Sequence, residues 1–181
     1  MGMVDRKQLE ALFTRFGYND FRWMNPKGIV VSEWVRMKCI FGCGRYGRNA
    51  SCPPNTLPVD ACRRLFDEYS TGVIFHFHKA LDNPGDRGPW SREVNSGLLE
   101  LEREVFLSGH HKTLLLFMSY CNLCDECTGD RAACEQPRLA RPTPEAMAVD
   151  VFATVRQCGL PIQVLTDYTQ AMNRYAFLLI E

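Results

Sequence analysis

Seven of the nine cysteines in this chain are gathered in two short stretches, Cys39 to Cys52 and Cys121 to Cys134. The odd count excludes complete pairing into disulfides, and the first ten residues lack the apolar segment of a secretory signal. In a reducing compartment, clustered cysteines indicate metal binding or catalysis. We therefore expect a cytoplasmic protein that folds around cysteine-bound metal.

Composition narrows the class of protein further. Basic and acidic residues balance at 21 each, whereas a generic nucleic-acid binder has a basic excess. The longest apolar runs, such as Leu114 to Met118, are too short to span a bilayer. We expect one metal-binding domain over residues 1–181, with no nucleic-acid partner and no membrane span.

Apolar periodicity predicts four helices separated by strand-like runs. The expected helices are Asp5 to Phe16, a segment from Pro58 to Tyr69, Ser91 to Leu107, and a segment from Thr143, as N-cap before Pro144, to Gly159. The expected strands are Gly72 to His78, Thr113 to Ser119, Ile162 to Leu165, Tyr175 to Ile180 and the less regular Ile29 to Val35. This alternation predicts an α/β or α+β fold, with helices packed on a mixed sheet and both cysteine loops at strand ends.

The second cysteine stretch has the stronger metal signature. It reads Cys121-Asn-Leu-Cys124-Asp-Glu-Cys127, followed after six residues by Cys134. CxxCxxC spacing lets one short turn present three thiolates to three irons, as in bacterial ferredoxins, where the last gap is three residues. The longer gap leaves open whether Cys134 closes the local cluster. Zinc is the alternative, but its usual two CxxC pairs do not match the spacing of Cys127 and Cys134.

The first stretch contains only three cysteines, Cys39, Cys43 and Cys52, with glycines between them and two prolines after the last. Three alternatives stay open. In the first, the loop holds a cluster with one iron open to a substrate or small ligand. In the second, the cluster takes a fourth ligand from elsewhere in the chain, such as Cys62 or Cys134. In the third, the loop is a structural zinc site with a remote ligand. An open iron would be a Lewis acid that polarises a substrate.

The two remaining cysteines, Cys62 and Cys158, fall on apolar helix faces, so we expect them in the core. The charges near the loops differ in sign. Residues 33–52 carry four basic and one acidic side chain, and residues 121–135 carry one basic and four acidic. One interpretation is that these are ordinary solvated charges. The other is functional: the basic loop screens an anionic cluster or attracts an anionic substrate, and the acidic loop docks a partner. Arg138 and Arg141 are candidates to neutralise a cluster or to pair with Asp150.

Taken together, the motifs resemble an uncharacterised prokaryotic family of predicted cysteine-rich metal-binding proteins. The first motif is Cys39-x3-Cys43-x2-Tyr46-Gly47-x4-Cys52-Pro53-Pro54. The second is the ferredoxin-like set Cys121, Cys124, Cys127 and Cys134, followed by Pro137, the run Ala140 to Met147, and Asp150 to Phe152. The resemblance covers most of the chain. It implies metal binding but no particular reaction.

The leading hypothesis is an iron–sulfur protein with two 4Fe–4S sites, held by the four cysteines of the second stretch and the three of the first. We expect it to transfer electrons to a redox partner protein or to support a partner enzyme. One alternative is an iron–sulfur enzyme whose open iron at the three-cysteine loop binds a small molecule for sulfur transfer or dehydration. The other is a zinc-stabilised interaction module.

Overall fold

The computed structural model describes residues 4–167 and 169–181. Its helices and strands follow the order α1 (Arg6–Arg15), β1 (Phe21–Met24), η1 (Pro26–Gly28), α2 (Glu33–Gly42), α3 (Val59–Asp67), β2 (Gly72–Lys79), η2 (Pro84–Asp86), α4 (Arg87–Leu107), β3 (Leu114–Leu116), η3 (Glu145–Met147), α5 (Val151–Gln157) and β4 (Met172–Leu179), where η marks a 3-10 helix. Among these residues, no helix is long and apolar enough to cross a membrane.

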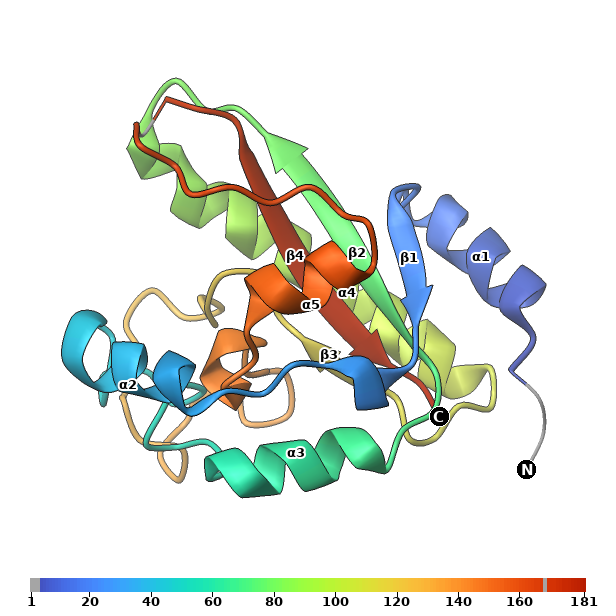
Figure 1. The fold of residues 1–181 in the computed structure, drawn as a ribbon, viewed down its shortest axis with the longest axis horizontal. Helices are drawn as coiled ribbons and strands as arrows, with labels where there is room; N and C mark the ends of the chain where they lie inside the picture. Colours follow the sequence, from blue (N-terminus) through green and yellow to red (C-terminus); the bar gives the residue numbers. More distant parts are fainter. Residues whose placement is uncertain (1–3, 168) are drawn as a thin grey trace.

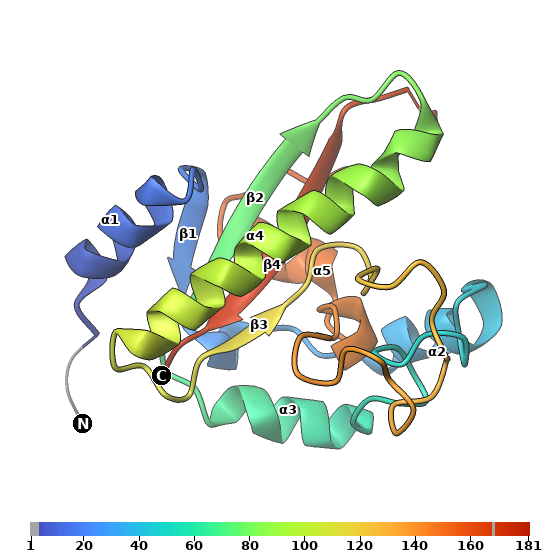
Figure 2. The ribbon, with the colours of Figure 1, turned by 180° about the vertical axis from the view of Figure 1, so that it is seen from behind.

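The four strands form one sheet in the order β1-β2-β4-β3, with helices on both faces (Figures 1 and 2). Helices α1 and α4 cover one face, and α3 and α5 cover the other. Each face has its own buried cluster because neighbouring residues of a strand point to opposite sides. In β4, for example, Phe177 packs with Cys62 and Val155, whereas Leu178 packs with Leu98 on the far face.

The α+β alternative of the predicted fold class is confirmed, but the sheet is not mixed. Every neighbouring pair of strands is antiparallel. Ile162 to Leu165, expected as a strand, lies outside the sheet. Both sides of β4 are already paired, with β2 and β3, so this neighbouring segment has no free edge beside β4 to join.

The first 45 residues contain the largest departures from the expected elements. The predicted strand Ile29 to Val35 is reduced to an isolated bridge between Val31 and Val149, and α2 begins at Glu33. The short strand β1 pairs with β2 and was not expected.

The predicted helix from Thr143 to Gly159 is divided into η3 and α5. Thr143 does cap its beginning, because its Oγ1 accepts a hydrogen bond of 3.1 Å from the Ala146 N–H. Ala148 then adopts a left-handed conformation at φ 59°, which ends the first piece. Asp150 caps the second piece by accepting from the Ala153 N–H at 2.9 Å.

Candidate metal centre

Cys39 and Cys43 lie at the C-terminal end of α2, where a loop after a strand was expected. Cys39 is in the last turn of the helix and Cys43 is the first residue beyond it. Side chains four residues apart share one side of a helix, and the Cys39 Sγ lies 4.0 Å from the Glu145 carbonyl oxygen. The expectation that this stretch follows a strand is therefore wrong, because Glu33 to Gly42 form a helix.

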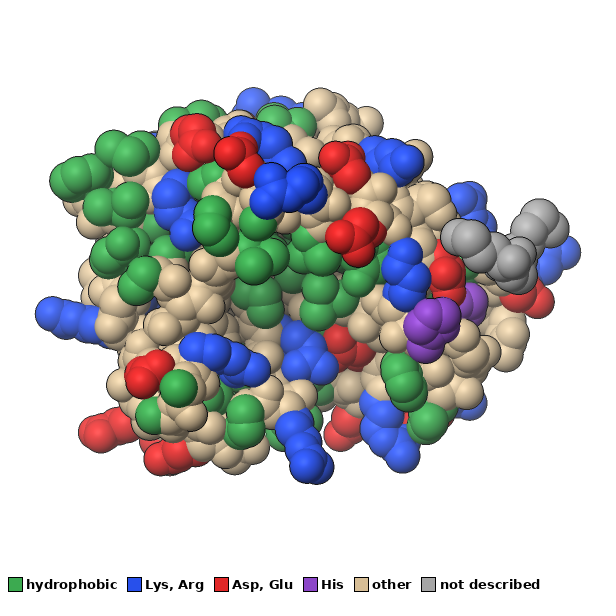
Figure 3. Space-filling model, turned by 90° about the horizontal axis from the view of Figure 1, so that it is seen from below, with side chains coloured by type: hydrophobic (Ala, Val, Ile, Leu, Met, Phe, Trp, Pro, Cys, Tyr) green, Lys and Arg blue, Asp and Glu red, His purple; other side chains and the backbone are tan. Residues whose placement is uncertain are grey.

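The same helix presents an apolar surface. Of its residues only Val35 is buried, whereas Trp34 is 47% exposed and Phe41 is 79% exposed. Apolar side chains gather at the end of the molecule where α2 lies (Figure 3, left).

The chain after α2 folds back and brings Cys52 to the first two cysteines. Gly47 adopts φ 69°, and its N–H donates to the Pro53 carbonyl oxygen at 3.0 Å. All three cysteines of this stretch line one cavity of about 620 Å³. The three thiols predicted as one site therefore face a common space.

The second cysteine stretch follows β3, as predicted, and is fixed at its start by buried amides. The Asn95 side chain of α4 donates to the Met118 carbonyl oxygen at 3.1 Å and accepts from the Met118 N–H at 3.1 Å. Next to Cys121, the Asn122 Nδ2 donates to the Ser91 Oγ at 2.9 Å. These hydrogen bonds hold the beginning of the stretch against α4.

The two cysteine stretches contact each other directly. The Ala50 N–H donates to the Cys127 Sγ at 3.3 Å, and the Asn49 Nδ2 donates to the Cys121 carbonyl oxygen at 2.8 Å. Asn49 is buried. Backbone N–H groups that point at cysteine sulfur are characteristic of iron–sulfur sites, where they tune the reduction potential.

A second contact lies at Gly129, which adopts φ 76°. The Asn55 Nδ2 donates to its carbonyl oxygen at 2.8 Å. A Cβ at position 129 would lie 3.3 Å from the Gly47 carbonyl oxygen, so any other residue would crowd the facing backbone and strain the positive φ that glycine adopts freely.

Burial and neighbouring thiols shift the acidity of these cysteines. Burial raises the pKa of Cys52 to about 12, and the negative charges of Cys43, Cys39 and Cys121 contribute. Burial also raises the pKa of Cys124, together with its acidic and cysteine neighbours, among them Cys121. Cys121 therefore lies close enough to act on thiols of both sets. Such crowded thiols ionise easily only with a cation bound between them.

Two arginines beside the second stretch, Arg141 and Arg92, have defined partners. Arg141 forms a two-pronged ion pair with Glu102, with Nη2 to Oε2 at 2.9 Å, so the proposed pairing with Asp150 is wrong. Arg92 donates to the Cys124 carbonyl oxygen at 3.2 Å and pairs with Asp125 at 2.8 Å.

The remaining cysteines lie in the core, as predicted. Cys62 is fully buried, its Sγ donates to the Leu57 carbonyl oxygen at 3.5 Å, and Cys158 packs partly buried against the same cluster. Cys62 is thereby directed into the core and not toward the three-cysteine cavity, which it does not line.

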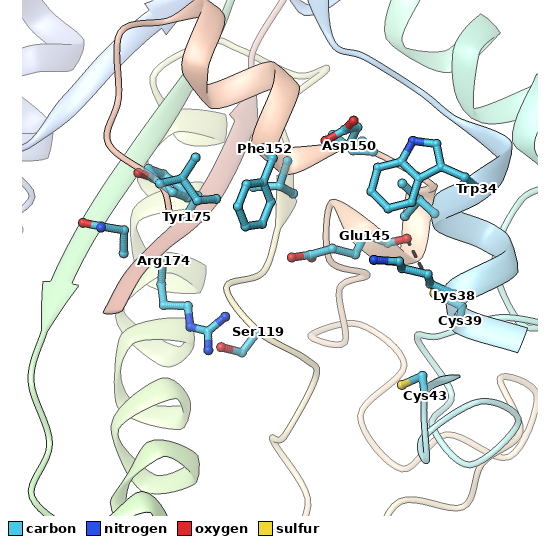
Figure 4. Close-up of a pocket in the computed structure, with 15 residues that line it drawn as sticks. Trp34, Lys38, Cys39, Cys43, Ser119, Glu145, Asp150, Phe152, Arg174 and Tyr175 are labelled. Carbon is cyan, nitrogen blue, oxygen red and sulfur yellow. Dashed lines mark hydrogen bonds between the residues drawn. The ribbon is translucent and has the colours of Figure 1, made fainter. Parts of the chain in front are cut away.

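A smaller cavity of about 320 Å³ adjoins the three-cysteine cavity (Figure 4). Arg174 of β4 and Glu145 of η3 line both cavities, together with Ser119, which lies in the loop after β3. Sequence reasoning missed all three, and it also missed Asn49 and Asn55. Asn49 and Asn55, whose side-chain amides flank Cys52, were a local sign of contacts near that cysteine. Nothing in the sequence near Arg174 indicates that it lies beside the cysteines.

The donor set fits an iron–sulfur cluster, and it fits zinc as well. Every candidate ligand is a thiol, and thiolates bind both. Among residues 4–167 and 169–181, no three His, Cys, Asp or Glu side chains converge as the ligands of a single metal ion do. The thiols of the first stretch instead face a cavity of about 620 Å³.

The family model for the predicted metal-binding proteins DUF2284 matches residues 22–180. The chain belongs to DUF2284. The DUF2284 match contains both cysteine stretches and every element from η1 to β4, and it leaves out α1. Metal binding is the property predicted for DUF2284 as a whole, and the resemblance inferred from the motifs is confirmed. Searches of curated proteins and of solved structures returned no match.

Proposed function

We propose that this protein binds two 4Fe–4S clusters and transfers electrons. Cys121, Cys124, Cys127 and Cys134 hold one cluster. The thiols of the first stretch, all of which line the 620 Å³ cavity, hold the other. That common cavity, in contact with a ferredoxin-like cysteine stretch, is the observation that carries the proposal. When bound, such clusters supply one-electron chemistry.

Charge around the cavity supports a cluster over zinc as the occupant. A 4Fe–4S cluster with cysteine thiolates is anionic, and Arg45, Arg87 and Arg174 all line this cavity. The Arg45 guanidinium stacks on the Tyr120 ring at 3.6 Å from its centroid, which holds one of these charges in place.

Contact between the two stretches supports electron transfer. The hydrogen bond from Ala50 to Cys127 places the two cysteine sets side by side, so an electron has a short path between them. The four-cysteine stretch also reaches the surface, where Cys127, Asp125 and Glu126 are exposed. A basic surface on a redox partner protein fits these acidic side chains.

A second candidate function is enzymatic, and the 320 Å³ cavity favours it. Cys39 and Cys43 line that cavity as well as the larger one, so a substrate in it lies next to the three-cysteine site. Three protein ligands leave one iron open to bind such a substrate.

Metal analysis of anaerobically purified protein tests the proposal. We expect about eight irons and eight acid-labile sulfides per chain if both cysteine stretches carry a 4Fe–4S cluster, a brown colour and an electron paramagnetic resonance signal after reduction. A colourless protein with stoichiometric zinc after anaerobic purification would contradict both candidate functions. A signal that changes when small molecules are added would favour the enzyme over the electron carrier.

A further inference from the structure

The smaller cavity has the size and form of a site for a small molecule. Its volume is about 320 Å³, at the low end of ligand pockets. The residues that line both cavities form the boundary between them: Cys39, Cys43, Ser119, Glu145 and Arg174. A molecule in the smaller cavity therefore lies against the three-cysteine site.

Arg174 is the side chain in this cavity best suited to bind a ligand. It is partly buried on β4, and its guanidinium forms no hydrogen bond or ion pair with any other described residue, although it carries five N–H donors. In Figure 4 the guanidinium points across the cavity toward Ser119. Its nitrogens are not among the fully buried, unpartnered side-chain atoms of the described residues, so they are open to the cavity, where an anion can accept hydrogen bonds from them.

The surroundings of Arg174 hold charges of both signs. Burial lowers the pKa of its guanidinium, the negative charge of Glu145 raises it, and the positive charge of Arg87 lowers it, so both groups are close to Arg174. The smaller cavity is also lined by one further cation, Lys38, and by two acidic residues, Glu145 and Asp150. The Asp150 carboxylate is already engaged as the cap of α5, which leaves Glu145 as the acidic group that faces Arg174.

The backbone conformation of Ser119 also indicates a functional site beside Arg174. It adopts φ 69°, a left-handed conformation that is unfavourable for serine and that often occurs at functional sites. Its hydroxyl makes no hydrogen bond to any other described residue and lies beside the Arg174 guanidinium in Figure 4. A donor is thereby available next to the arginine.

Most of the remaining lining of the cavity is apolar and aromatic. It consists of Trp34, Val35, Val149, Val151, Phe152, Ile162 and Tyr175. The Tyr175 hydroxyl donates to the Pro161 carbonyl oxygen, and its ring stacks on His76 with centroids 5.1 Å apart, so the ring is held in place at the edge of the cavity. A ligand for this cavity must combine one anionic group with an apolar body.

We propose that this cavity binds a small organic carboxylate, whose carboxylate is held by Arg174 and whose apolar body packs against Phe152 and Tyr175. The planar guanidinium matches a carboxylate through two parallel hydrogen bonds. The proposal deepens the enzymatic candidate function, because it names the chemical class of the molecule that lies next to the three-cysteine site.

The test measures affinity by calorimetry on the protein as purified without oxygen. The probes are hexanoate and benzoate, with hexanamide and benzamide as uncharged matches and inorganic phosphate as a second anion. We expect the carboxylates to bind at least about tenfold more tightly than the amides, as a charge-assisted hydrogen bond implies. Arg174→Gln should abolish this preference, whereas Arg103→Gln, an exposed arginine on α4, should retain it.

Glu145→Gln gives a result of opposite sign and does not alter the sheet. Removing its negative charge should tighten carboxylate binding several-fold and leave amide binding unchanged. Equal affinities for carboxylates and amides, tighter binding of phosphate than of either carboxylate, or unchanged binding in Arg174→Gln would each overturn the proposal. So would an Arg174→Gln protein whose visible spectrum changes while its carboxylate affinity does not, because Arg174 would then serve the cluster.

The readout separates this inference from the proposed iron–sulfur function. Carboxylate binding that depends on Arg174 in a protein that contains zinc would support the inference and remove the iron–sulfur proposal. An iron–sulfur protein that binds none of the carboxylates would do the reverse.

Discussion

The backbone N–H of Ala50 donates a hydrogen bond to the Sγ of Cys127, 77 residues further along the chain. The two cysteine motifs are therefore one structural unit, although the sequence separates them by a helix, a strand, a long helix and another strand. A substitution in one stretch should therefore also change the stability of the other.

Asn49→Ala tests this dependence. The buried Asn49 side chain donates to the Cys121 carbonyl oxygen at 2.8 Å and accepts from the Ser51 N–H at 2.9 Å. Its loss should lower the free energy of unfolding by about 1–3 kcal/mol and reduce the iron bound by both stretches. Urea unfolding and iron analysis measure the two effects. Asn25→Ala, which removes an exposed turn cap, is the control and should leave the iron content unchanged.

Cys134→Ser tests whether the fourth cysteine of the second stretch is a ligand. We expect this variant to lose iron from that cluster when purified without oxygen, since a serine hydroxyl is a poor replacement for a thiolate. Cys158→Ser is the matched control, because Cys158 packs against the core outside both motifs. Unchanged iron and sulfide content in Cys134→Ser would show that the ligand assignment is wrong.

Glu102→Ala removes a buried charge that ties α4 to β3 and to the segment after the second stretch. Its carboxylate accepts from the Leu115 N–H at 2.8 Å and pairs with Arg141 at 2.9 Å. Because the variant leaves the Arg141 charge and a buried N–H unpaired, we expect a loss of about 3–5 kcal/mol in urea unfolding. Glu104→Ala, which breaks surface ion pairs with Arg103 and Arg15, should cost about 0–1 kcal/mol. Similar losses in both variants would refute this account.

Tyr18 predicts a loss of stability at alkaline pH. Burial, with contributions from Glu100 and Glu93, raises the pKa of Tyr18 to about 12 in the folded protein, against about 10 in the unfolded chain. The folded state therefore holds the phenolic proton longer, and this contribution to stability is full below pH 10 and is lost between about pH 10 and about pH 12. Tyr18→Phe should lose less stability than the parent between pH 9 and pH 11 in urea unfolding. Parallel curves for the two proteins would exclude this role.

Helices with clear local signals could be predicted from the sequence. Asp5 caps α1 by accepting from the Gln8 N–H, and an apolar stripe places Leu9 and Phe13 in the core. Both signals depend on neighbours a few residues apart. Strand direction depends on distant partners, so the antiparallel pairing of β4 with β2 and β3 could not be read in advance. The break at Ala148 depends on Val149, which pairs with Val31.

The candidate site shows the same division. Spacing grouped Cys121, Cys124 and Cys127, because three thiols on one turn are a local pattern. The cavity beside Cys39 required tertiary structure, since Arg174 and Glu145 reach it from β4 and η3. No periodicity in the sequence relates those segments to α2.

The contact between Ala50 and Cys127 also governs how the protein is made. With a separation of 77 residues, a ribosome needs roughly 4 to 15 s to reach Cys127 after Ala50 at ordinary rates of synthesis. During that interval the first cysteine stretch has no partner, and Cys39, Cys43 and Cys52 are open to oxidation or to the wrong metal. If the first stretch binds a cluster as proposed, its complete surroundings exist only after the second stretch has been made, so the order of synthesis would set when that site can be loaded correctly.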